Sequence, residues 1–173
     1  MISIVSARPE DHQDILDIGS ISVKQAHLGS CPDEDLQAYM DSHYNAEAII
    51  KELENPAYRY HILYYKGKAA GFSKIILNTA HAEIRAENVA KLDRIYLLSE
   101  YVGLKLGAEL MKFNIELARN NDQAGLWLVT WVGNERAIAF YEKAGFEIAG
   151  TTKFWVTETR FNLNHLMYLP IKG

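Results

Sequence analysis

The chain has 173 residues and a formal net charge of −4 at pH 7. That length fits one domain, residues 1–173, and the charge argues against nucleic acid as a main partner, because phosphate backbones bind clustered lysine and arginine. The single cysteine, Cys31, excludes a disulfide framework and a thiolate metal cluster, so we expect no metal. No apolar run approaches the ~20 residues of a membrane span, and the N-terminus lacks the features of a signal peptide. We expect a cytoplasmic protein without a membrane partner.

The first half of the chain predicts a strand, three helices and a β-hairpin. In chain order these are a strand over 2–8, helices from Pro9, over 33–43 and over 45–55, and a hairpin over 57–78. Asn45 is a good helix cap, and Pro56 explains why the third helix stops. The hairpin is indicated by two β-rich runs joined at Lys66-Gly67-Lys68. The polar residues 81–88 predict a loop.

The second half predicts an alternation of strands and helices. Strands are expected over 89–98 and 125–131, helices over 102–120 and 135–144, and two final strands on either side of Thr157-Glu158-Thr159. The strand over 125–131 is apolar on both faces, which is typical of a central strand covered on both sides. The order therefore predicts an α/β (α+β) fold, with a central twisted mixed sheet of about seven strands flanked by helices on both faces.

The segment 102–120 reads as a helix that opens near two glycines, Gly103 and Gly107. Its apolar residues form two adjacent stripes, one of which includes Leu104, while Lys105 belongs to the charged line in the first turn. A helix start presents free N–H groups and the positive end of the helix dipole, so Lys105 is either solvated or in contact with a phosphate. Two glycines alone are a weak phosphate-loop signal, since a tight strand-to-helix turn explains them equally well.

A second motif, NERAIAFYEKAGF over residues 134–146, follows the central strand. Its apolar residues lie on one helical face, Asn134 can cap the start, and Gly145 can end the helix. Together with the preceding strand, glycine turn, helix and strand, this motif resembles the GNAT superfamily of acetyl-CoA-dependent N-acetyltransferases. The phosphate loop departs from that family's usual Arg/Gln-x-x-Gly-x-Gly/Ala pattern, because those positions hold Val102, Lys105 and Gly107.

The resemblance implies acetyl-CoA as cosubstrate and assigns residues to its binding. Tyr141 is the implied general acid, with its hydroxyl facing the cofactor sulfur. The end of strand 89–98 is expected to splay from strand 125–131, so that a backbone N–H of Leu97 or Leu98 reaches the acetyl oxygen, a contact worth ~3 kcal/mol. The other implied cofactor-binding residues are Gly103, Leu104, Lys105, Leu106, Gly107, Ala108 and Asn134.

The general base and the acceptor are less defined by the resemblance. Asp93 is the candidate base, with His81 and Glu83 as alternatives; an ion pair with Arg94 would instead make Asp93 structural.

Within the superfamily the chain looks like the bacterial spermidine/spermine (Pai-type) branch, which implies a small-molecule amine acceptor such as a polyamine. The acidic and aromatic residues that could bind it are Asp33, Glu34, Asp35, Tyr39 and Tyr44; a solvated helix start explains the acidic ones equally well. The alternatives are N-acetylation of a protein N-terminus, an amino acid or an aminoglycoside, or an acetyl-CoA-binding regulator with little catalysis. The final strands could pair in a homodimer.

Overall fold

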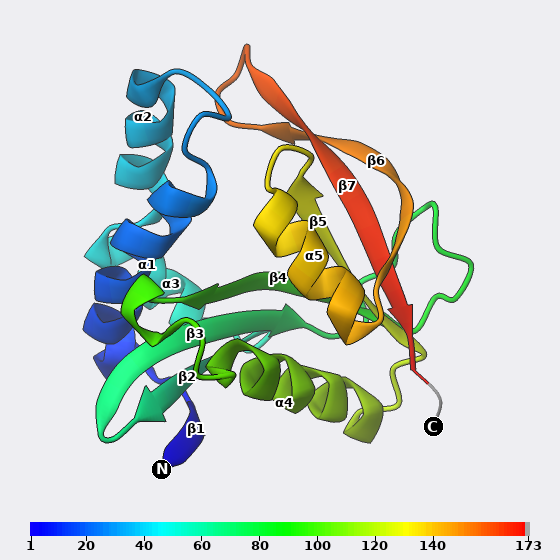
Figure 1. Ribbon diagram of the computed structural model, residues 1–173, viewed down its shortest axis with the longest axis horizontal. Helices are drawn as coiled ribbons and strands as arrows, with labels where there is room; N and C mark the ends of the chain where they lie inside the picture. Colours follow the sequence, from blue (N-terminus) through cyan, green and yellow to red (C-terminus); the bar gives the residue numbers. More distant parts are fainter. Residues whose placement is uncertain (172–173) are drawn as a thin grey trace.

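The computed structural model describes residues 1–171, which form one seven-stranded sheet with helices on both faces (Figure 1). The strands are β1 (Ile2–Ser6), β2 (Tyr58–Tyr65), β3 (Lys68–Ile76), β4 (Val89–Leu97), β5 (Gly125–Trp131), β6 (Glu147–Trp155) and β7 (Phe161–Pro170). The helices are α1 (His12–Ala26), α2 (Asp33–His43), α3 (Ala46–Glu54), α4 (Leu106–Asn120) and α5 (Glu135–Ala144), with short 3-10 turns η1 (Pro9–Asp11) and η2 (Ser99–Tyr101). Among the described residues, no helix combines the length and apolar character needed to cross a membrane.

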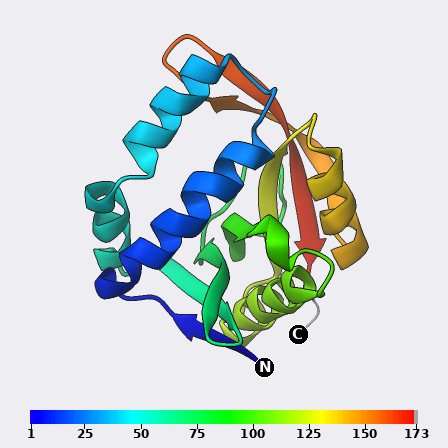
Figure 2. The ribbon, with the colours of Figure 1, turned by 60° about the vertical axis from the view of Figure 1, so that its left-hand side comes forward.

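The strand order is β1-β2-β3-β4-β5-β7-β6, and only β4 and β5 pair in parallel. Helices α1 to α3 pack on one face, where Ile15 and Ile49 meet Phe72. Helix α4 packs on the other face, where Met111 meets Leu126 from the central strand (Figures 1 and 2). The predicted mixed sheet covered on both faces is therefore confirmed.

The helix predicted over 102–120 begins later than expected. Helix α4 starts at Leu106, and the four residues before it form a turn in which Gly103 and Lys105 have φ angles of 93° and 62°. Left-handed backbone cannot belong to a right-handed helix, so the prediction of helix over 102–105 was wrong. As a consequence Leu104 is not part of the buried stripe, and its side chain is 49% exposed.

The parallel pair β4–β5 is short, and this creates the gap on which the site depends. Pairing covers only Val89 to Lys91 on β4, after which the two strands diverge. Just beyond this point β4 carries one extra residue, Asp93, because Leu92 and Arg94 oppose consecutive residues of β3. Such a bulge bends a strand and increases its twist. The predicted splay of the two strands is therefore confirmed.

Candidate active site

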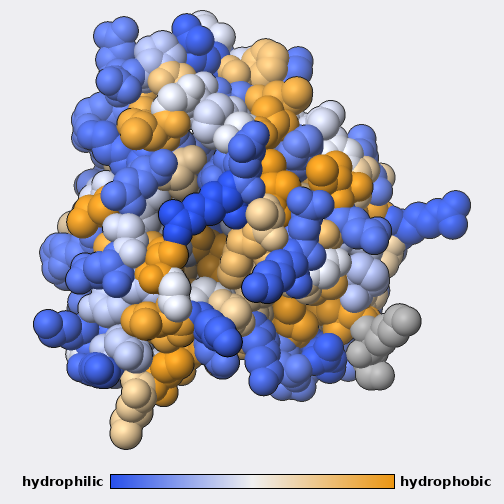
Figure 3. All heavy atoms as spheres, in the orientation of Figure 1, coloured by the Kyte–Doolittle hydropathy of each residue, from blue (hydrophilic) through white to orange (hydrophobic). Residues whose placement is uncertain are grey.

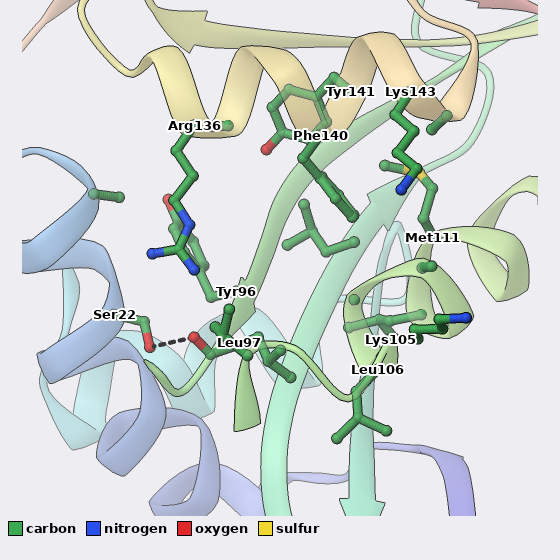
Figure 4. A pocket seen from close by; sticks show the side chains of 18 of the residues that line it. Ser22, Tyr96, Leu97, Lys105, Leu106, Met111, Arg136, Phe140, Tyr141 and Lys143 are labelled. Carbon is green, nitrogen blue, oxygen red and sulfur yellow. Dashed lines mark hydrogen bonds between the residues drawn. The ribbon is translucent and has the colours of Figure 1, made fainter. Parts of the chain in front are cut away.

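A cleft with a volume of about 760 Å³ opens beside the end of β4, where this strand no longer pairs with β5. Its walls come from the end of β4, the start of α4, one side of α5 and the last turn of α1 (Figure 4). The space-filling view shows apolar surface in a hollow near the middle of this face, with strongly hydrophilic side chains at the rim (Figure 3). The cleft thus combines an apolar floor with a charged border.

The start of α4 forms one end of the cleft. The first bond of this helix runs from the Glu109 N–H to the Lys105 carbonyl at 3.2 Å, so the N–H groups from Leu106 to Ala108 are not used inside the helix. The predicted cofactor residues Gly103, Lys105, Leu106, Gly107 and Ala108 all line the cleft. Leu104 is absent from the described lining residues, because the turn carries its side chain outward. Free N–H groups and the helix dipole make this end suited to an anion.

Four cationic side chains also line the cleft: Lys105, Lys112, Arg136 and Lys143. Within residues 1–171, none of the four has a carboxylate at ion-pairing distance. Arg136 and Lys143 extend from α5 toward the cavity (Figure 4). They lie two helical turns apart and hence on one face of α5, a spacing that could have revealed them in the sequence, where they had no predicted role.

The end of β4 presents its backbone to the cleft at alternate residues. Leu98 already donates its N–H to the Ala70 carbonyl of β3 at 2.9 Å. N–H groups of adjacent residues on a strand point in opposite directions, so the Leu97 N–H points away from β3 into the gap. The Leu97 side chain lines the cleft, and Leu98 is not among the described lining residues. Leu97 is therefore the available donor, and the prediction that Leu98 contributes its N–H is corrected.

Tyr141 projects from α5 into the cavity (Figure 4). It lines both the cleft and a second, smaller cavity of about 50 Å³, so it stands where the two meet. Its ring packs edge-on against Phe140 and Phe146, with centroid distances of 5.5 and 6.0 Å. Burial raises the pKa of Tyr141 to about 12. The hydroxyl is therefore protonated at neutral pH and can donate to a group in the cleft.

Asn134 also lines both cavities, but its amide has structural contacts. Its Oδ1 accepts from the Ala137 N–H at 3.2 Å and so caps α5, as predicted. Its Nδ2 donates to the Ala26 carbonyl at the end of α1, at 3.4 Å. The side chain thus ties α5 to α1 at the wall of the cleft.

Asp93 belongs to an ion cluster that we define as Glu52, Lys74, Lys91, Asp93 and Arg94. Its two carboxylate oxygens lie 3.0 Å from the Nζ atoms of Lys74 and Lys91, and Arg94 Nε is 3.8 Å away. Burial alone would raise its pKa, but Lys74 and Lys91 outweigh that effect and lower the pKa to about 2. A carboxylate with so low a pKa is a weak proton acceptor, although Asp93 does line the smaller cavity.

The alternative bases lie elsewhere. His81 packs edge-on against the Trp127 ring at 4.9 Å and accepts the Glu83 N–H on its Nδ1 at 3.1 Å. Glu83 is exposed, and neither residue is among the described lining residues of the two cavities.

The residues expected to bind a cationic acceptor are only partly available. Asp35 forms an ion pair at 2.9 Å with Arg160, the residue just before β7. Asp33 and Glu34 are exposed in the first turn of α2. Tyr44 is 9% exposed and lies under the Arg94 guanidinium at 4.9 Å, so it belongs to the core. Tyr39 packs edge-on against Phe154 of β6 at 5.8 Å.

Comparisons with curated proteins find relatives that match part of the chain. An uncharacterized N-acetyltransferase in the pepI 3′ region of Lactobacillus delbrueckii subsp. lactis is 30% identical over 112 residues, 65% of each chain. The putative [ribosomal protein bS18]-alanine N-acetyltransferase of Bacillus subtilis (strain 168) is 31% identical over 106 residues, 61% of this chain and 65% of that one. The matches thus span slightly less than two thirds of these two relatives' own length.

Two solved structures share the fold across nearly the whole chain. The PaiA N-acetyltransferase from Thermoplasma acidophilum, in complex with coenzyme A, has a TM-score of 0.78 at 20% identity, covering 98% of this chain and 99% of that one. The ribosomal-protein-S18-alanine N-acetyltransferase from Escherichia coli has a TM-score of 0.68 at 22% identity, covering 100% and 96%. The family model described as Acetyltransferase (GNAT) family matches residues 20–146, which is most of the chain. The protein therefore belongs to the GNAT family of acetyltransferases, as its sequence motifs predicted.

Proposed function

We propose that the protein is an acetyl-CoA-dependent N-acetyltransferase that acts on a primary amine. The observation that carries this proposal is the cleft beside the diverging end of β4, which is lined both by the start of α4, with its unused N–H groups, and by Tyr141. The residues present fit coenzyme A: unused N–H groups and four cations suit its phosphates, and the open edge of β4 suits an amide-bearing arm. When bound, acetyl-CoA supplies an activated thioester as the acetyl donor.

In this proposal the chain's own groups stabilise the charges that develop during transfer. The Leu97 N–H points into the gap and donates to the acetyl oxygen, a contact typically worth ~3 kcal/mol. Tyr141 donates its proton to the departing sulfur; with a pKa of about 12, it is in the protonated form at neutral pH. The positive end of α4 and Lys105, Arg136 and Lys143 hold the phosphates.

Two classes of acceptor have support. The Pai-type resemblance and the fold shared with the PaiA enzyme support a polyamine such as spermidine or spermine. The relative from Bacillus subtilis, named for alanine N-acetylation of a ribosomal protein, supports a polypeptide N-terminus.

The ion cluster and two unpaired amide side chains favour a polypeptide acceptor over a polyamine. The two carboxylates of the ion cluster, Glu52 and Asp93, are already shared among three cations. Two asparagines of β7, Asn162 and Asn164, are 6% and 3% exposed and each has one amide atom without a partner in the described chain. Asn164 lies beside Trp131, which lines the smaller cavity. Unpaired amides match peptide groups, which polyamines lack.

The test is an acetyl-CoA turnover assay that follows release of free thiol. The acceptor panel contains spermidine, spermine, putrescine, lysine, an aminoglycoside and peptides with different N-terminal residues. We expect turnover with at least one class, and Tyr141→Phe to reduce that turnover ten-fold or more while acetyl-CoA affinity, measured by calorimetry, stays unchanged. Binding of acetyl-CoA without turnover on any amine would contradict the proposal and favour a cofactor-binding regulator.

A further inference from the structure

The smaller cavity of about 50 Å³ is where an acceptor nitrogen would meet the site. It shares five lining residues with the cleft, namely Ala26, Ile95, Tyr96, Asn134 and Tyr141. Its other walls come from β4, β5 and the residue that ends α1. If the proposed function holds, a primary amine enters here from the side opposite the cofactor. It arrives mostly protonated at pH 7, because an alkyl amine has a pKa of ~10.4 and a polypeptide N-terminus one of ~7.7–8.0. The cavity must therefore contain a group that accepts this proton.

Five titratable side chains line the smaller cavity: His27, Asp93, Arg94, Tyr96 and Tyr141. Arginine and tyrosine are protonated at neutral pH, and burial raises the pKa values of Tyr96 and Tyr141 further. Asp93 is held by three cations in the ion cluster. Among these lining residues, only His27 offers a neutral nitrogen lone pair.

The backbone of His27 is held by hydrogen bonds, whereas its imidazole ring makes none within residues 1–171. The residue caps the end of α1, where its N–H donates to the Val23 carbonyl at 3.2 Å. Its own carbonyl accepts from the Ser30 N–H at 3.0 Å and the Ser30 hydroxyl at 2.6 Å. The imidazole lies nearly parallel to Phe154, at 6.0 Å, and makes no hydrogen bond to any residue in the described range 1–171. A half-buried imidazole held this way can turn a ring nitrogen toward the cavity.

We propose that His27 is the general base that takes the proton of the acceptor ammonium. Burial lowers the pKa of His27, so the ring is neutral at pH 7. The charged and titratable groups that face the cavity with it are Asp93, Arg94 and Tyr96 of β4 and Tyr141 of α5. Burial and the nearby Arg94 also lower the pKa of an ammonium entering the cavity, which makes the transfer easier.

The proton count of the proposed step balances. His27 takes the first proton from the ammonium, and the nitrogen lone pair forms the new C–N bond as the C–S bond breaks. Tyr141 gives its proton to the sulfur and regains one from the acylated nitrogen. His27 then releases its proton to solvent, so one proton leaves the site for each acetyl group transferred.

The first test is His27→Gln, with His12→Gln as the control from the opposite end of the same helix. His12 is also half-buried, but it bonds the Pro9 carbonyl and does not line the cavity. We expect His27→Gln to reduce kcat/KM at pH 7 by roughly 100-fold or more and to remove the acidic limb of its pH profile. The loss should shrink as the pH approaches the pKa of the amine, and acetyl-CoA affinity should not change. Loss of the acidic limb in Asp93→Asn, but not in His27→Gln, would overturn the proposal.

A second test does not depend on turnover. In an NMR titration of the histidine rings, the signals missing from His27→Gln identify this residue. We expect them to titrate below pH 6.5 and to shift when spermidine or a peptide with a free N-terminal amine is added with coenzyme A present. A ring that titrates above 6.5, or that ignores both spermidine and a peptide amine, would overturn the role of His27. Absence of turnover in the unmutated protein would instead count against the proposed function.

Discussion

Replacement of Lys74 by methionine tests how much the ion cluster stabilises the fold. The Lys74 side chain is only 5% exposed, and its Nζ lies 2.7 Å from Glu52 and 3.0 Å from Asp93. It also sits 4.0 Å from the centroid of the Tyr58 ring. Methionine keeps most of the apolar stem and removes the charge, so the two carboxylates lose their shared partner while the packing is largely preserved.

The expected loss follows from the pKa of Asp93 and from the burial of the pairs. Lowering that pKa from 3.8 to about 2 corresponds to about 2.5 kcal/mol of stability at pH 7. Lys91 remains in the variant and still stabilises the Asp93 carboxylate, so only part of this free energy is lost. Glu52 loses its ion pair with Lys74, which is shorter than its pair with Arg94. Breaking a buried pair costs about 3–5 kcal/mol, and less here because both carboxylates are partly exposed. We expect a loss of about 2–3 kcal/mol, or roughly 5–10 °C in Tm.

The assay is urea denaturation followed by circular dichroism at several pH values. The folded-state pKa of Asp93 lies below its unfolded value, so its contribution is fully present above about pH 4 and is lost as the pH falls toward 2. The difference in free energy of unfolding between the parent protein and Lys74→Met should therefore narrow as the pH falls from about 4 toward 2. Lys24→Met is the control, because Lys24 is exposed and, among residues 1–171, bonds only Gln37, at 3.0 Å. A variant within about 0.5 kcal/mol of the parent at pH 7 would refute the reasoning.

Other predictions concern the cleft. Arg136→Gln and Lys143→Gln should each weaken acetyl-CoA binding in calorimetry by up to about five-fold, and by less in high salt, because exposed charge contacts are screened. A Cβ atom at Gly71 would lie 2.6 Å from the Tyr96 carbonyl, so Gly71→Ala should displace the end of β4 and lower both turnover and Tm. Asn134→Ala removes the α5 cap and should cost about 1 kcal/mol in thermal unfolding.

Much of the fold could be predicted because its signals are local. The alternation of strands 57–78 and the helical spacing in 135–144 depend on neighbouring residues, and both elements form close to the predicted bounds. The start of α4 could not be predicted from apolar spacing, because Leu104 fits the helical stripe. Only the backbone angles of Gly103 and Lys105 exclude it from the helix.

The site was harder to predict because it depends on register and on distant contacts. The N–H that bonds β3, that of Leu98, cannot also face the cleft. A shift of one residue in the β3–β4 register would exchange the roles of Leu97 and Leu98. The sequence places Arg94 next to Asp93 but does not reveal Lys74 on the adjoining strand. His27 reaches the smaller cavity only because α1 ends there, and no local motif marks it.

The bulge at Asp93 connects the ion cluster to the open cleft. One extra residue in β4 accompanies the end of its pairing with β5, and that separation exposes the Leu97 N–H. Lys74 opposes Arg94 across the β3–β4 pair and also binds Asp93, so the ion cluster holds the bulged residue in place. A carboxylate that anchors the strand in this way cannot take a substrate proton without weakening its own ion pairs. The geometry therefore separates two roles. Asp93 positions the strand, and the proposed proton transfer requires a group that lines the smaller cavity outside the ion cluster, as His27 does.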